Sequence, residues 1–331
     1  MIRVTFFQRR PHPGHYSMER LFAAVRSALP SDIACRVAIS RFHSRGVLAR
    51  IYNILEAAFR QGDVNHVIGD VHYLTFLLPK RKTVLTIHDC GKWAELRGWR
   101  KVLYGWLWVR GPIARAARIT TISDATRQDL IRMASLAPER ITVIPDCIPA
   151  EFQPAPAAFN AAKPRILQVG TRENKNLPRV IKALAGVPCH LEIVGQLTGD
   201  QQRSLAAHGI EYSNGVHLTD AELLERFRTC DLLIFVSTSE GFGMPIVEAQ
   251  AIGRPVVTSA MSPMTDTGGE GACYVDPFDV EAIRAGVVRV AQDAEYRNDL
   301  ISRGFMNVRR FQSKAIAEQY AEIYRRTAGA R

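Results

Sequence analysis

The chain has 331 residues, of which 47% are apolar and 23% are charged. This length predicts two domains of ~150 residues each, and the composition excludes disordered and fibrous proteins. The best apolar run, Val102–Val109, is far shorter than the ~20 residues that span a bilayer. The six cysteines form no CxxC pair and no signal-peptide segment is evident, so we expect a cytoplasmic protein with reduced thiols.

The positive charge is concentrated in the first half of the sequence. Residues 1–155 hold 23 Lys and Arg against 12 Asp and Glu, whereas residues 156–331 hold 20 of each. An excess of this kind favours an anionic partner: a membrane surface, a phosphate-bearing substrate or nucleic acid. An unspecialised basic surface is an equal alternative.

The first half alternates short β-branched runs with helical patterns, which is typical of a parallel sheet. We predict a helix near Tyr16–Leu29 and an Ala/Pro-rich linker over Gln153–Pro164. The predicted strands are Ile2–Phe7, Arg36–Ile39, Val64–Ile68, Thr83–Ile87, Arg118–Ile122 and Ile141–Ile144.

After the linker the alternation begins again. The predicted strands are Arg165–Val169, His190–Val194, Asp231–Val236 and Pro255–Thr258. The predicted helices are Leu177–Leu184, Asp220–Arg228 and Met244–Ile252, followed by a helical tail from Val280 to about Arg326. We therefore expect two doubly wound, Rossmann-like domains whose ligand lies in a cleft between the carboxyl ends of both sheets.

Several chemistries are disfavoured because their motifs are missing. The sequence has no GxxxxGK[ST], no GxGxxG after a strand, no HExxH and no GxSxG. It also lacks Asp-x-Asp, the pattern with which many sugar-nucleotide enzymes hold a diphosphate through a divalent metal.

The strongest motif is Ser-Glu-Gly-Phe-Gly-Met-Pro-Ile-Val-Glu-Ala at residues 239–249, directly after a predicted strand. The glycines permit close backbone approach to a ligand, and Pro245 suits a first helical turn. The free amides of that helix start favour a phosphate. Glu240 lies in the loop beside it, and Glu248, expected within the first turn, can bind a vicinal diol such as a ribose.

A second strand–turn–helix segment begins at Gly170 and contains Arg172 and Lys175, whose charges can neutralise a departing diphosphate. In the first half, Gly14 follows the first strand and permits backbone approach to a ligand. His88 and Asp89 follow the strand Thr83–Ile87, although Asp89 is also suited to orienting a turn.

Together these segments resemble the retaining glycosyltransferases of family 4, which have the GT-B fold, over nearly the whole chain. Weaker similarities lie at residues 121–124, 141–146, 215–220 and 253–257. The two glutamates in their Gly-Phe-Gly-Met-Pro setting are the most specific part. Lys175 follows the Gly-Thr turn one residue sooner than in many members, so Arg172 does not match the usual arginine securely.

The resemblance implies a role for each matching position. Glu240 is expected to contact the transferred sugar, with His88 and Asp89 as further catalytic candidates. Glu248 is expected to bind the ribose, and Gly14 to approach the donor phosphate or the acceptor. The diphosphate is expected to be held by the backbone amides of Phe242, Gly243 and Met244 together with Arg172 and Lys175. Gly170 and Pro245 are further expected donor-binding positions.

The resemblance also implies an activity and a domain plan. We expect metal-independent transfer of a hexose such as mannose or glucose from a UDP- or GDP-sugar, without a cofactor, to a glycan or lipid-linked acceptor in polysaccharide or glycolipid biosynthesis. Residues 1–155 are expected to bind the acceptor and 156–308 the donor, with a helix in 309–331 packing back on the first domain. The alternatives are a GT-B-type sugar-nucleotide 2-epimerase, or a basic nucleic-acid-binding protein; on the main interpretation no nucleic acid is bound.

All four tryptophans, at positions 93, 99, 106 and 108, lie among basic residues within one short window. Such mixing suits the headgroup layer of a membrane, and residues 92–118 could then bind the inner membrane face peripherally. Equally, the tryptophans could pack inside the first domain or line an acceptor pocket.

Overall fold

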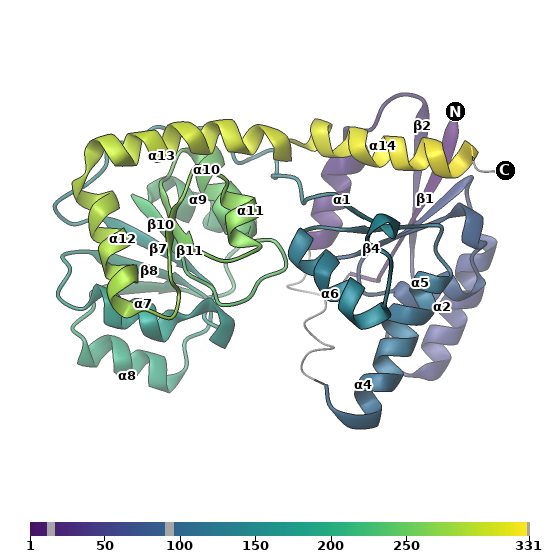
Figure 1. The fold of residues 1–331 in the computed structure, drawn as a ribbon, viewed down its shortest axis with the longest axis horizontal. Helices are drawn as coiled ribbons and strands as arrows, with labels where there is room; N and C mark the ends of the chain where they lie inside the picture. The colour runs from purple at the N-terminus through teal and green to yellow at the C-terminus, as the bar shows by residue number, and fades with distance from the viewer. Residues whose placement is uncertain (12–16, 90–95, 330–331) are drawn as a thin grey trace. The chain divides into compact units, whose positions relative to one another are not determined.

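The computed structural model describes residues 1–11, 17–89 and 96–329. The chain forms two compact units, each built on a six-stranded parallel sheet (Figure 1). Unit 1 comprises Met1–Cys147 and Ser313–Arg331, and unit 2 comprises Ile148–Gln312. These boundaries differ from those expected at 155/156 and 308/309, because the segment after Cys147 and residues 308–312 both belong to unit 2, where the Ile148 amide donates to the Phe311 carbonyl at 2.9 Å.

The sheet of unit 1 has the strand order β2-β1-β3-β4-β5-β6. The order reverses at β1, which pairs with β2 on one side and β3 on the other. All six strands were expected from the sequence. Their bounds are β1 Ile2–Gln8, β2 Ile33–Ile39, β3 Val64–Val67, β4 Thr83–Ile87, β5 Arg118–Thr121 and β6 Ile141–Val143.

Two layers of helices cover this sheet. One layer joins α1 (Ser17–Ser27) to α14 (Ser313–Gly329), whose Tyr320 and Tyr324 are buried beside Phe22 and His66. The other layer packs against a second cluster of buried side chains. Its members are α2 Val47–Phe59, η1 His72–Leu77, η3 Gly105–Arg110, α5 Gly111–Ala114 and α6 Asp124–Ala134; η2 Lys80–Lys82, α4 Gly98–Tyr104 and η4 Pro138–Arg140 complete the unit.

The sheet of unit 2 has the strand order β12-β11-β10-β7-β8-β9. The four inner strands match the predicted runs, whereas the edge strands β9 and β12 were not predicted. Edge strands are short and only half covered, so they need no continuous apolar run. The bounds are β7 Arg165–Val169, β8 His190–Val194, β9 Tyr212–Gly215, β10 Leu232–Phe235, β11 Val256–Ser259 and β12 Cys273–Val275.

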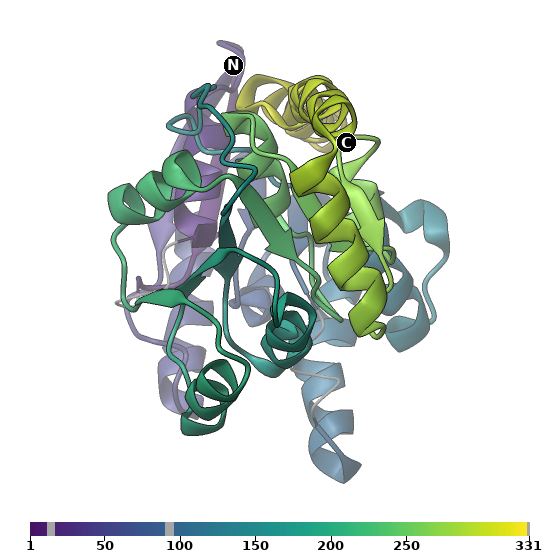
Figure 2. The same ribbon diagram turned by 90° about the vertical axis from the view of Figure 1, so that its left-hand side faces the viewer.

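Helices lie on both faces of this sheet (Figure 2). One group comprises α7 Leu177–Leu184, α8 Gly199–Ala207 and α12 Val280–Gln292. The other comprises α9 Asp220–Thr229, α10 Met244–Ile252, α11 Met264–Gly268 and α13 Ala294–Asn307. The short turn η5 Glu173–Lys175 directly precedes α7, and η6 Val308–Phe311 follows α13. The predicted helical tail is therefore three α-helices, of which the last belongs to unit 1.

Candidate active site

The loop after β10 leads into α10 through a backbone conformation that favours glycine. Gly243, the residue before α10, has φ +101°, and Pro245 lies in the first turn. Phe242 is buried and its carbonyl accepts a 2.6 Å hydrogen bond from Thr267 Oγ1, which fixes the loop. The start of α10 has no side-chain cap, so its amides are suited to an anion.

Lys175 lies across the turn that follows the neighbouring strand β7. Gly170 in that turn has φ +95°, and a Cβ there would lie 2.8 Å from Lys175 Cγ. A glycine is therefore needed for the lysine side chain to lie where it does. Lys175 Nζ is 2.6 Å from Glu240 Oε1 and 4.6 Å from the centre of the Phe235 ring. Lys175 and Glu240, two of the charged residues that the sequence assigned to the site, thus form an ion pair.

Asn174 is a site residue that the sequence reasoning missed. Its Nδ2 donates to the carbonyl oxygen of Ser239 at 2.8 Å and to Glu240 Oε1 at 3.4 Å. Its own carbonyl oxygen accepts a 2.8 Å hydrogen bond from the amide of Thr238. Asn174 therefore ties the loop after β7 to the loop after β10 and orients the Glu240 carboxylate.

We expect Asn174→Ala to lower kcat about tenfold while leaving KM for the donor nearly unchanged. The lost hydrogen bonds include one to a charged group, and such bonds contribute ~1.5–3 kcal/mol. Steady-state kinetics and thermal unfolding of the variant measure both effects. Asn298→Ala, on the exposed surface of α13, is the matched control. An unchanged kcat, or a loss explained by unfolding, would contradict the role.

Two other predicted site residues also lie in unit 2. Arg172 is exposed, and among the described residues no side-chain partner of Arg172 is found. The structure therefore groups Lys175, and not Arg172, with Glu240. Glu248 is the fifth residue of α10, so it lies in the second turn of the helix rather than the first, and it is partly buried. Met244 and Pro245 open the helix as expected.

In unit 1, His88 and Asp89 follow β4 at the carboxyl edge of the sheet. Burial lowers the pKa of His88 to about 4, so its imidazole is neutral at pH 7. His88 Nε2 is buried and has no hydrogen-bond partner among the described residues. A neutral imidazole with an unpaired nitrogen is suited to binding a hydroxyl group. Asp89 is exposed.

A further cluster near His88 was not predicted. Arg9, after β1, forms ion pairs with Glu19 of α1 at 2.8 Å and with Asp70, after β3, at 3.3 Å. These side chains connect the carboxyl ends of two neighbouring strands. Gly14, which the sequence placed here, lies outside the described residues, as does Trp93.

The described tryptophans have different environments. Trp99 and Trp106 are 70% and 58% exposed. Trp108 instead packs against Tyr104, with ring centres 5.4 Å apart, and under the Arg50 guanidinium at 4.6 Å. Among the described tryptophans, Trp99 and Trp106 are therefore exposed, whereas Trp108 is packed against other side chains.

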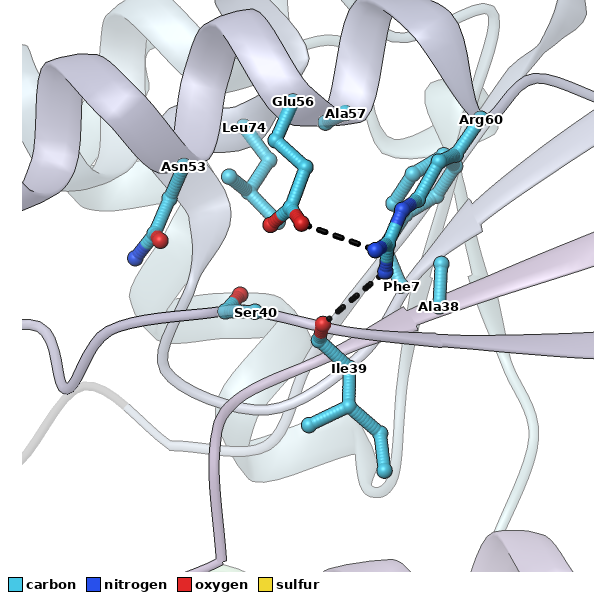
Figure 3. Close-up of a pocket in the computed structure, with 9 residues that line it drawn as sticks. All are labelled: Phe7, Ala38, Ile39, Ser40, Asn53, Glu56, Ala57, Arg60 and Leu74. Atoms are coloured by element: carbon cyan, nitrogen blue, oxygen red, sulfur yellow. Dashed lines mark hydrogen bonds and ion pairs between the residues drawn. The ribbon is translucent and has the colours of Figure 1, made fainter.

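Several other features bear on ligands. Among the described residues, no three His, Cys, Asp or Glu side chains lie close enough together to hold a metal ion. None of the described helices has the length and apolar character required to cross a membrane. A hollow of about 10 Å³ between α2 and the ends of β1 and β2 holds about one water and not a sugar (Figure 3). A hollow of about 400 Å³ beside α11 and α13 contains none of the predicted site residues.

Solved structures similar to this chain show its fold. The crystal structure of Anabaena HepE in complex with UDP and glucose superimposes with a TM-score of 0.77 at 16% identity, covering 98% of this chain and 100% of that one. The two-unit architecture is therefore the GT-B fold, as the sequence predicted.

Sequence comparisons agree with this fold. The O-antigen chain mannosyltransferase B of Escherichia coli is 26% identical over 77% of this chain and 73% of its own length. The MMP alpha-(1->4)-mannosyltransferase of Mycolicibacterium hassiacum is 27% identical over 70% of this chain and 60% of its own length. The family model Glycosyltransferase Family 4 matches residues 4–152, and Glycosyl transferases group 1 matches residues 150–305. Because these two models together span nearly the whole sequence, the chain belongs to glycosyltransferase family 4.

Proposed function

We propose that the protein transfers a hexose, such as mannose or glucose, from a UDP- or GDP-sugar with retention of configuration and without a metal. The observation that supports this most directly is the Lys175–Glu240 ion pair beside the uncapped start of α10. Two relatives are described as mannosyltransferases, and the HepE structure contains UDP and glucose. The epimerase and nucleic-acid alternatives are not favoured, because the matching family model, the relatives and the similar solved structure point to glycosyltransferases.

The proposed chemistry relies on positioning and charge. The bond between the sugar C1 and the diphosphate oxygen breaks, and the acceptor oxygen bonds to C1 on the same face. The leaving diphosphate takes the acceptor proton. Lys175 and the amides of α10 stabilise the negative charge on the diphosphate, while Glu240 stabilises the positive charge on the sugar ring. We propose ribose binding for Glu248 and a hydrogen bond to the sugar for His88.

We further propose a lipid-linked or glycan acceptor in polysaccharide or glycolipid biosynthesis, reached from the inner membrane face. Residues 97–118 contain six Lys and Arg and no Asp or Glu, and Trp99 and Trp106 are exposed. Basic residues near an anionic leaflet each contribute ~1 kcal/mol, and tryptophan favours the interface. This arrangement supports peripheral binding through residues 92–118.

Nucleotide binding and transfer assays test the donor site. One of UDP and GDP, at a hundred times its Kd, should add ~2.7 kcal/mol to the stability of unit 2. For a unit of this size the midpoint of thermal unfolding should rise on the order of 5–10 °C. No shift with either nucleotide would contradict the proposed donor class.

The same assays test the proposed absence of a metal. Transfer should continue in excess EDTA, because Lys175 and helix amides are proposed to do the work of a cation. Loss of activity with EDTA, restored by Mg²⁺ or Mn²⁺, would contradict metal independence alone and leave the transferase assignment intact.

A further inference from the structure

Helix α2 of unit 1 exposes an unusual surface. Its exposed residues are all apolar or aromatic, with Leu48 and Phe59 83% and 89% exposed. Five of them recur at helical spacing along one face, which we call the α2 stripe. The α2 stripe consists of Leu48, Ile51, Tyr52, Leu55 and Phe59.

The face of α2 that packs on the protein combines apolar and polar side chains. Ala57 is buried in the core of unit 1, and Ile54 packs against the same cluster. Asn53 is 1% exposed, and its side chain bonds both the amide and the carbonyl of Phe42, at 3.1 and 2.9 Å. Glu56 accepts from the amide of Arg41 at 3.1 Å and pairs with Arg60 at 2.8 Å. Figure 3 shows Glu56 and Arg60 extending from the helix toward the strand that contains Ile39.

Most large apolar side chains of α2 therefore face water, whereas an ordinary surface helix places its apolar face on the core. The polar side chains are held inward by specific hydrogen bonds, so the orientation of α2 is well determined. An apolar stripe kept in contact with water indicates a surface that another apolar phase covers.

A second exposed apolar group adjoins α2. Val102 of α4 is exposed, as are Trp99 and Trp106. The two regions are connected, because Arg50 of α2 lies over the Trp108 ring of η3 at 4.6 Å, and both elements pack on η1. Tyr52 also packs edge-on against exposed Phe42, with ring centres 5.0 Å apart.

The charge around the stripe identifies the covering phase. Residues 33–55 contain four arginines and no Asp or Glu, and Arg41 and Arg45 are exposed just before α2. A second copy of the chain would bring two basic surfaces together, which is unfavourable. An anionic lipid bilayer offers both an apolar interior and negative headgroups.

We propose that α2 lies in the headgroup layer of an anionic bilayer, with the α2 stripe against the acyl chains and Arg41 and Arg45 at the lipid phosphates. This deepens the proposed function, because it names the surface that would bring the enzyme to a lipid-linked acceptor. It differs from binding through residues 92–118 alone, because it requires the α2 stripe to contact the acyl chains.

Cosedimentation of the full chain with phosphatidylglycerol/phosphatidylcholine vesicles, without donor, tests the proposal. The double substitution Leu48→Glu with Phe59→Glu, called the α2 variant, should lower the partition coefficient between vesicles and water at least tenfold. The reason is that two glutamates replace inserted apolar groups. Phe278→Glu with Met306→Glu, two exposed apolar positions in unit 2, is the matched control and should bind like the wild type. Arg41→Gln with Arg45→Gln should weaken binding several-fold and reduce its salt dependence.

A variant at Arg100 and Lys101 of α4 distinguishes membrane binding through α2 from membrane binding through residues 92–118. If α2 inserts, Arg100→Glu with Lys101→Glu should weaken binding at low salt but leave part of it at high salt. Equal binding of the wild type and the α2 variant would overturn the proposal, as would absence of wild-type binding. A wild-type dimer that becomes monomeric in the α2 variant, without vesicle binding, would make the stripe a self-association interface and also overturn it.

The nucleotide-induced rise in unfolding temperature is measured on the same variants. It should be unchanged in the α2 variant, since α2 belongs to unit 1 and the donor is proposed to bind unit 2. Loss of vesicle binding in that variant supports the membrane surface even if neither nucleotide binds, so failure of the proposed function is distinguishable from failure of this inference.

Discussion

Lys175→Ala and Glu240→Ala are each expected to lower kcat about a hundredfold or more while leaving the fold intact. Lys175 Nζ and Glu240 Oε1 are 2.6 Å apart at the ends of neighbouring strands, where the structure holds both charges before the donor binds. Removing one such preorganised group costs roughly 3 kcal/mol of transition-state stabilisation.

Single-turnover and steady-state kinetics with the donor identified by thermal shift measure this effect. Lys182→Ala and Glu225→Ala change exposed residues of the same types in unit 2 and should retain full activity. Because the two site residues are paired, the double variant should lose less than the product of the single losses. Near-normal kcat in either single variant would contradict the assigned roles.

The sequence predicted the inner framework of both units because buried parallel strands are continuous apolar runs. It placed Lys175 and Glu240 after two separate strands, β7 and β10, and the structure shows that these strands pair directly. Their ion pair, across 65 residues of sequence, depends on this pairing, which sequence periodicity does not give. Asn174 was missed because asparagine in a turn is commonplace and its partner is a distant loop.

Which face of α2 is exposed could not be predicted from the sequence, for a related reason. Apolar residues recur along Val47–Phe59 at helical spacing, and such a pattern ordinarily predicts that the apolar face is buried. The burial of Asn53 is decided by its hydrogen bonds to Phe42, which lies in a loop whose path depends on the tertiary structure. For the same reason, the sequence did not predict whether Trp99 and Trp106 are exposed or buried.

Asp146→Asn is expected to stabilise the protein at pH 8 by up to about 4 kcal/mol and to add little at pH 4. Asp146 is 7% exposed, and among the described residues none donates a hydrogen bond to its carboxyl group. Burial raises its pKa from 3.8 to about 7. Each pKa unit corresponds to ~1.4 kcal/mol of difference between the folded and unfolded states.

The sign follows from proton binding. Between pH 3.8 and about 7 the folded protein holds a proton at Asp146 that the unfolded chain has lost, so this carboxyl group makes the free energy of unfolding fall as pH rises. His66 and His88 have the opposite effect. Burial lowers their pKa values to about 3 and 4, so they make the free energy of unfolding rise with pH up to about 6.5.

Urea unfolding of wild type and Asp146→Asn at pH 4, 6 and 8 isolates the carboxyl group, because the histidine contributions are common to both proteins and cancel in the difference. The gain in stability should grow steadily from pH 4 to 7 and then level off, because above the folded-state pKa both states carry the charge. Asp63→Asn is the control of opposite sign: the Asp63 carboxylate is exposed and paired with Arg3, which lowers its pKa, so its removal should destabilise more at pH 8 than at pH 4. A gain in stability for Asp146→Asn that is equal at all three pH values would not come from the charge of the carboxyl group. Such a result would contradict a raised pKa for Asp146.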